Sequence, residues 1–162
     1  MPHRGTTTID RTEGVDHLLV DGSNDLRTAL VACYGVEVGT EAWAEAMVVG
    51  WERRAELEHM DNPLGYLFRV GQSKARKHVR WASRRSNLPG GDHVRSAPDA
   101  SMVELLDALA DLRPMQRAAV LLVTAHGFSY RHAADVLGVT QSAVTNHVHR
   151  GLARLRRALD TD

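Results

Sequence analysis

Two closely spaced helix starts flank a glycine within residues 129–159, and this pattern restricts the possible folds more than any other feature. Ser129 and Thr140 are residues that cap helix N-termini, so we predict a short helix over Tyr130–Leu137 and a longer one through Leu159. Gly138 stands where the turn between them needs a positive φ. A small residue, Ala134, lies where the two helices would cross closely. The stretch therefore predicts a helix-turn-helix.

The second of these helices carries a row of polar side chains, while its valines are expected to pack against the first helix. Amide, hydroxyl, imidazole and guanidinium groups reach base edges and phosphates when such a helix enters a major groove. The predicted DNA-contacting residues are Gln141, Ser142, Thr145, Asn146, His149, Arg150 and Arg154. The alternative is a helical hairpin with a solvated polar face. The small residue, the turn glycine, the capped second helix and the basic tail together favour DNA binding.

The whole chain reads as all-α, with two small helical domains joined by a flexible linker. Residues 1–23 are polar and are predicted to be a disordered lead, and residues 24–85 to form the first helical domain. Residues 86–100 contain two prolines and two glycines, a composition typical of a linker. Residues 101–162 then form the second domain, which contains the helix-turn-helix.

Helix starts and stops divide the first domain further. We expect one helix from Asn24 or Asp25 to Tyr34, a second from Thr40 to Leu57, and a third capped by Asn62 and running to Arg85. The third has an apolar stripe at helical spacing: Leu64, Phe68, Gly71, Ala75, Val79 and Ala82.

In the second domain, Ser101 and Glu104 have the spacing of a capping box, which predicts the start of a helix there.

Charge is unevenly distributed although the formal net charge is zero. Residues 1–65 carry five basic and twelve acidic side chains, whereas residues 66–100 carry eight basic and two acidic ones. This asymmetry indicates an acidic end and a basic middle with different partners, unless the basic run is only a solvated face.

Several classes of protein are disfavoured. No segment approaches the roughly 18 consecutive apolar residues of a membrane span, and no secretory signal is apparent, so we expect a cytoplasmic protein. The single Cys33 lies on an apolar stripe and is expected in the core. His147 and His149 are two residues apart on a helix and therefore point in different directions. We expect no metal, no cofactor, no catalytic site and no enzymatic activity.

The chain resembles the extracytoplasmic-function sigma factors of bacterial RNA polymerase over roughly residues 25–85 and 101–160. Three motifs carry the resemblance in the second stretch: "L-x-x-L-R-P-x-Q-R", "G-x-S-Y-x-x-x-A-x-x-L-G-V" and "V-x-N-H-V-H-R-G-L-x-R-L". They are similar to the family's fourth region, which reads the −35 promoter element. The resemblance implies this role for the polar row of the last helix, with Asn146, His149 and Arg150 foremost.

The match in the first stretch rests on shorter motifs. Glu41, Glu45 and Trp51 resemble the helix with which the family's second region binds the polymerase clamp, although Ala44 replaces the usual Gln. Residues 62–70 resemble the helix that faces the −10 element, with Tyr66 replacing a Trp and Ser73 replacing an Asn. The resemblance implies that seven residues face the −10 DNA: Tyr66, Arg69, Gln72, Ser73, Lys74, Arg76 and Lys77.

Aromatic side chains in a basic segment also suit the stacking of single-stranded bases. Of those available, Phe68 lies on the apolar stripe and is expected in the core, whereas Trp81 fits either place.

The implied function is that of a sigma subunit, which directs core polymerase to specific promoters. Its implied partners are RNA polymerase core, promoter DNA and an anti-sigma protein, with no insertion into a membrane. The alternative is a stand-alone helix-turn-helix regulator that binds DNA without polymerase. Such a regulator usually carries a receiver or a ligand-binding domain, whereas residues 25–85 lack the strand alternation of a receiver. The first domain therefore favours the sigma subunit.

Overall fold

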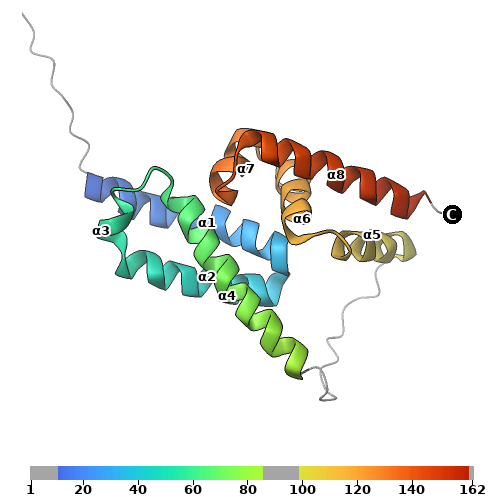
Figure 1. The fold of residues 1–162 in the computed structure, drawn as a ribbon, viewed down its shortest axis with the longest axis horizontal. Helices are drawn as coiled ribbons and strands as arrows, with labels where there is room; N and C mark the ends of the chain where they lie inside the picture. The colour runs from blue at the N-terminus through green and yellow to red at the C-terminus, as the bar shows by residue number, and fades with distance from the viewer. Residues whose placement is uncertain (1–10, 86–98, 161–162) are drawn as a thin grey trace, which may run out of the picture.

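The computed structural model describes residues 11–85 and 99–160, and within them every regular element is a helix (Figure 1). The predicted all-α fold is confirmed. The N-terminal lobe contains α1 (Arg11–Tyr34), α2 (Val36–Glu52), α3 (Arg54–Leu57) and α4 (Pro63–Arg85). The C-terminal lobe contains α5 (Ala100–Ala110), α6 (Pro114–Val120), the π-helical turn η1 (Leu121–Ala125), α7 (Tyr130–Leu137) and α8 (Gln141–Leu159).

The first helix begins much earlier than the sequence indicated. Residues 11–23, predicted as part of a disordered lead, form the first half of α1. The physical reason is tertiary. Val15 and Leu19 are buried in the main core, and the free energy of their burial offsets the conformational entropy that this polar segment loses when it becomes helical. The remainder of the predicted lead, residues 1–10, and most of the predicted linker, residues 86–98, lie outside the described residues.

Helix α2 also begins earlier than predicted, at Val36 rather than after Thr40, and ends at Glu52 before the short α3. Its buried face consists of small residues: Gly39, Ala42, Ala46 and Gly50. Trp43 and Met47 pack at the edge of this face, while Trp51 is 45% exposed. The small side chains allow α1 and α4 to pack closely against α2.

Helix α4 has the predicted bounds and the predicted cap, since the Asn62 side-chain oxygen accepts a hydrogen bond from the Gly65 amide at 2.9 Å. Phe68, Gly71 and Ala75 of its predicted apolar stripe are buried. Val79 is 42% exposed, so the stripe leaves the core in the last turns. The side chains of residues 81–85, including Trp81 and Ala82, lie outside the described part of the structure.

Helix α5 does not have the predicted capping box. Asp99 occupies the N-cap position and Ser101 lies inside the first turn, where its hydroxyl donates to the Asp99 carboxylate at 3.1 Å. Because the helix begins at Ala100, Ser101 lies inside it and does not occupy the N-cap position.

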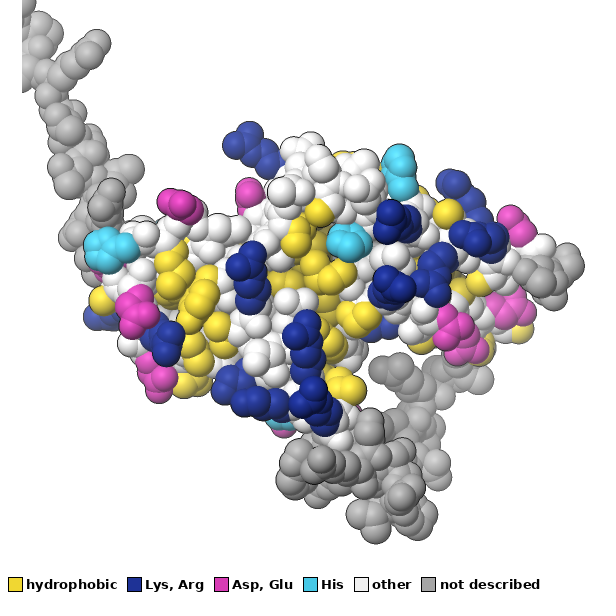
Figure 2. All heavy atoms as spheres, viewed as in Figure 1, with side chains coloured by type: hydrophobic (Ala, Val, Ile, Leu, Met, Phe, Trp, Pro, Cys, Tyr) yellow, Lys and Arg dark blue, Asp and Glu magenta, His cyan; other side chains and the backbone are white. Residues whose placement is uncertain are grey.

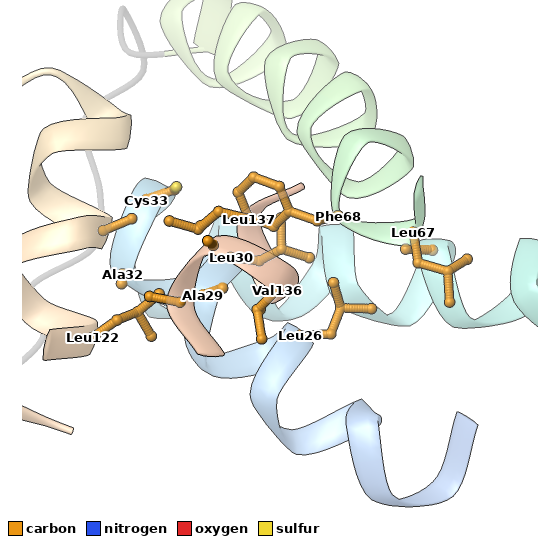
Figure 3. Packing of buried hydrophobic residues seen from close by; sticks show 14 of the residues in the cluster. Leu26, Ala29, Leu30, Ala32, Cys33, Leu67, Phe68, Leu122, Val136 and Leu137 are labelled. Carbon is orange, nitrogen blue, oxygen red and sulfur yellow. The ribbon is translucent and has the colours of Figure 1, made fainter. Parts of the chain in front are cut away.

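The two lobes share one buried core rather than standing apart. Leu26, Leu30 and Phe68 of the N-terminal lobe lie in the same cluster as Leu122 and Leu137 of the C-terminal lobe (Figure 3). A smaller cluster, made of Ala108, Leu112, Val120 and Leu155, holds α5 against α6 and α8. The sequence predicted two lobes that can separate, and in this structure they are packed together.

Cys33 lies in the shared core with no measurable exposure. Burial raises the pKa of its thiol to about 12, against a smaller opposing effect of the Arg117 guanidinium. The thiolate is the reactive form, so we expect a thiol reagent to label native protein at pH 8 far more slowly than protein in denaturant. Rates measured with and without guanidinium chloride test this. Equal rates would show that Cys33 is accessible in the native chain.

Candidate nucleic-acid interface

The predicted helix-turn-helix is present in α7 and α8, and its three local signals act as expected. The Ser129 hydroxyl accepts a hydrogen bond from the His132 amide at 3.0 Å, and the Thr140 hydroxyl accepts one from the Ala143 amide at 3.1 Å. Gly138 adopts a left-handed conformation with φ of 64° between the helices. These local interactions fix where each helix begins and the direction in which α8 leaves the turn.

Helix α8 separates its apolar and polar sides clearly. Val144, Val148, Gly151 and Leu155 are buried against the rest of the lobe. The polar row of α8, comprising Gln141, Ser142, Thr145, Asn146, His149, Arg150 and Arg154, lies on the opposite side and is exposed except for the half-buried Thr145. The Thr145 hydroxyl donates to the Gln141 carbonyl at 3.1 Å, and Arg154 donates to the Gln116 side chain at 3.4 Å. Most of the row is therefore free to meet a macromolecule.

Positive charge continues from α8 across the neighbouring α4. On the face seen in Figure 2, Lys and Arg side chains gather over these two helices, and Asp and Glu side chains lie toward the two ends of the molecule. Such a field attracts the phosphate backbone of nucleic acid regardless of sequence.

The predicted −10 residues on α4 are in a different situation, because two of them hydrogen-bond the C-terminal lobe. Arg69 donates to the carbonyl of Gly138 at 3.0 Å, in the turn of the helix-turn-helix. The Gln72 amide nitrogen lies 3.4 Å from the sulfur of Met115. Tyr66 is half-buried and its hydroxyl accepts a hydrogen bond from Arg53 at 3.1 Å, whereas Ser73, Arg76 and Lys77 are exposed. In this arrangement Arg69 and Gln72 both contact the C-terminal lobe; Gln72 is half-buried, whereas Arg69 remains exposed.

Two glycines make this close approach possible. A Cβ built on Gly65 would lie 2.7 Å from the Gly138 Cα and 2.6 Å from the Asn62 amide nitrogen. The same Asn62 amide donates to the Asp135 carbonyl at 2.9 Å, so the start of α4 is tied to the end of α7. The packed lobes thus cover part of the α4 surface.

The predicted polymerase-binding acids lie beside α4. Glu45 contacts His78 Nε2 at 2.5 Å and Lys74 Nζ at 3.2 Å, and Glu41 lies 3.3 Å from His78 Nδ1. The hydrogen bond from His78 is the largest of the effects that lower the pKa of Glu45. Lys74, predicted to face DNA, is therefore paired with a residue predicted to face polymerase. Trp51, the third polymerase-binding residue, presents an exposed indole at the end of α2.

This pairing gives a pH-dependent contribution to stability. Because the folded pKa of Glu45 lies below its ordinary value of 4.5, the contribution is present above that value and is lost as the pH falls through the folded pKa. We expect Glu45→Gln to lower stability at pH 7 and the difference from the native chain to narrow below about pH 4.5. Urea unfolding across pH measures it, with the exposed Glu37→Gln on the same helix as control. A difference that does not change with pH would contradict the pairing.

The main contact missed from sequence is made by Arg117 on α6. Its guanidinium donates to the carbonyls of Ala32 and Cys33 at the end of α1, and to those of Leu109 and Ala110 at the end of α5. The Ala32 bond is 3.0 Å long. Helix C-termini leave carbonyls without intrahelical partners, and a cation there also meets the negative end of the helix dipole. Nothing in a linear sequence identifies which arginine will join the nearby end of one helix to the distant end of another.

No grouping of three or more His, Cys, Asp or Glu side chains suited to a metal ion occurs among residues 11–85 and 99–160. Over the same described part, no helix combines the length and the apolar character that crossing a membrane requires.

Comparison with known proteins gives a family match in the C-terminal lobe. Residues 102–155 match the family model "Sigma-70, region 4". The RNA polymerase sigma-E factor of Streptomyces antibioticus is 40% identical over 57 residues, which are 35% of this chain and 32% of that protein. The chain thus spans about a third of the length of that curated relative.

Two solved structures resemble the chain over nearly its full length. The sigma factor RpoE of Bartonella quintana, solved with the anti-sigma factor NepR, has a TM-score of 0.59 at 21% identity and covers 93% of this chain and 99% of its own. CnrH, solved with the cytosolic domain of CnrY, has a TM-score of 0.56 at 22% identity and covers 94% of each chain. At this level of identity the likeness establishes the fold. The region 4 match thus covers the C-terminal lobe, and the likeness to these two structures covers the fold of the whole chain.

Proposed function

We propose that this chain is a sigma subunit that directs bacterial core RNA polymerase to specific promoters. One observation carries the proposal: a region 4 domain presents an exposed polar row on the second helix of its helix-turn-helix. That helix inserts into the major groove of the −35 element, where Asn146, His149 and Arg150 contact base edges or phosphates. Gln141, Ser142, Thr145 and Arg154 extend the same contact surface along the helix.

The N-terminal lobe supplies the remaining contacts. Glu41, Glu45 and Trp51 bind the polymerase clamp, and α4 faces the −10 element through its polar and basic side chains: Tyr66, Arg69, Gln72, Ser73, Lys74, Arg76 and Lys77. Because Gln72 is half-buried against Met115 of the C-terminal lobe, separation of the lobes would expose it to DNA, and it would also release the exposed Arg69 from the Gly138 carbonyl. Residues 86–100 act as the tether between domains 24–85 and 101–162 when they do so. The helical segment 11–23 extends the first domain.

The polymerase supplies the chemistry of RNA synthesis, and this chain acts without catalytic residues in the cytoplasm, where polymerase works. An anti-sigma protein is the expected regulator, as the sigma factor RpoE of Bartonella quintana was solved bound to one. Once bound, such a protein would have to prevent the two lobes from contacting promoter DNA at the same time.

A transcription assay tests the proposal. Purified protein is mixed with bacterial core polymerase and a pool of genomic promoter fragments, and new transcripts are sequenced. Discrete starts that depend on the protein are expected. DNA binding without polymerase, together with no new starts in its presence, would favour a stand-alone helix-turn-helix regulator instead.

Arg150 provides the sharpest test of the α8 surface. We expect Arg150→Ala to weaken holoenzyme binding to its promoter by about 1–3 kcal/mol if the guanidinium contacts a base. Arg54→Ala removes the same charge at α3, on the other lobe, and should have little effect. Footprinting titrations at several salt concentrations measure the promoter affinity of the holoenzyme with either variant. We expect this affinity to fall steeply with salt in both cases. Unchanged affinity for Arg150→Ala would remove this residue from the interface.

A further inference from the structure

A pocket lies where the two lobes meet, and its walls are unusually rich in arginine. The end of α1 and the middle of α4 contribute one side, and the start of α6 and the middle of α8 contribute the other. Its volume is about 420 Å³, which falls within the range of small-molecule sites. The lining residues are Tyr34, Gln72, Arg76, Arg113, Pro114, Met115, Gln116, His147 and Arg150.

The charge of the pocket is one-sided. Arg76, Arg113 and Arg150 line it, and no carboxylate does. Among the described residues, none of these three guanidiniums forms a salt bridge. The Arg76 guanidinium donates a hydrogen bond to the Tyr34 hydroxyl, a neutral group that does not cancel the charge of Arg76. Three like charges around one cavity repel one another, and an anion placed between them would remove that cost.

The remaining walls define the kind of anion. Arginine's planar fork matches phosphate oxygens with two parallel hydrogen bonds. Beside the guanidiniums stand hydrogen-bonding groups, the Gln72 amide and the His147 imidazole, and nonpolar surface from Pro114 and Met115. Burial lowers the pKa of His147, with a further contribution from Arg150, so this imidazole is neutral near pH 7 and can either donate or accept. The combination suits a molecule with phosphate groups at one end and a less polar body at the other.

We propose that this interlobe pocket binds the phosphate groups of a small phosphorylated molecule of about nucleotide size. The walls come from both lobes, so the pocket exists only while the lobes are packed together. A bound ligand therefore stabilises the packed arrangement, and it also occupies Arg150, which belongs to the proposed −35 surface. By linkage, ligand and promoter DNA oppose each other's binding. This consequence, unlike the pocket itself, rests on the proposed function.

Calorimetric titration of the full chain with ADP and with pyrophosphate tests the pocket directly. Arg113→Ala is the informative variant, because Arg113 is exposed at the start of α6 and is not among the proposed DNA contacts. Arg131→Ala removes an exposed arginine of the same lobe outside the pocket and serves as the matched control. We expect saturable binding of one molecule per chain, weakened about tenfold or more by Arg113→Ala, as for loss of one charge-assisted pair, and unchanged by Arg131→Ala.

The results that would contradict the pocket differ from those that would contradict the proposed sigma function. Absence of saturable binding of both probes would overturn the pocket, as would equal losses in the two variants. Tighter binding of ADP than of pyrophosphate supports the nucleotide-sized body, and equal binding would overturn that part. Addition of ADP should also weaken promoter binding. If ADP binds but promoter affinity does not change, the competition is wrong, whereas a chain that binds no promoter at all contradicts only the sigma proposal.

Discussion

Phe68→Ala is expected to lower the free energy of unfolding by about 3–5 kcal/mol, the usual cost of truncating a buried aromatic ring. The Phe68 ring has no measurable exposure and lies in the core shared by both lobes, near Leu137 of α7 (Figure 3). Its removal leaves a cavity where α4 meets the C-terminal lobe. For a small domain this is a large part of the total stability.

Denaturant titration followed by circular dichroism measures the loss. Val48→Ala removes an aliphatic side chain that is 57% exposed on α2, so its effect should remain within about 0.5 kcal/mol. A loss below about 1 kcal/mol for Phe68→Ala would mean that the ring is not packed between the lobes as described.

Arg117→Ala is expected to loosen the packing of the two lobes and to lower stability by about 1.5–3 kcal/mol, the range for hydrogen bonds to a charged group. The variant leaves the carbonyls of Ala32 and Cys33 without the donor that the C-terminal lobe provides. It also releases the end of α5. We therefore expect a larger radius of gyration in solution scattering and faster amide exchange near the end of α1.

Arg131→Ala again serves as the control, because it removes the same type of side chain from an exposed position on α7. Unfolding titrations give the energy and solution scattering gives the lobe arrangement. If Arg117→Ala lowers stability without any change in scattering or exchange, this residue supports only the C-terminal lobe. If neither quantity changes, the hydrogen bonds across the lobes contribute nothing in solution.

The features that could be predicted from sequence are those that short segments specify. Ser129, Gly138 and Thr140 fix the helix-turn-helix through hydrogen bonds and a φ value that involve only neighbouring residues. Asn62 fixes the start of α4 in the same way. The valine spacing in α8 placed the polar row on the exposed side, because the period of an α-helix alone decides which side chains share a face.

Predictions failed where distant residues decide. The first half of α1 is polar in sequence and was expected to be disordered, yet it is helical since Val15 and Leu19 enter a core built by other helices. The capping box failed for a local reason, because Asp99, two residues before Ser101, occupies the N-cap position of α5 instead.

The sequence by itself therefore determined the helical class, the helix-turn-helix and the exposed row on α8, since caps, turn glycines and helical period are local physical constraints. Only the tertiary structure decided that the lobes share a core, that Arg69 and Gln72 contact the C-terminal lobe, and that Arg117 ties two helix ends together. It also decided that three arginines from separate segments line one pocket. Apart from the bonds of Arg117 to the nearby end of α5, these outcomes depend on contacts between residues tens of positions apart, whose energies follow from packing in three dimensions.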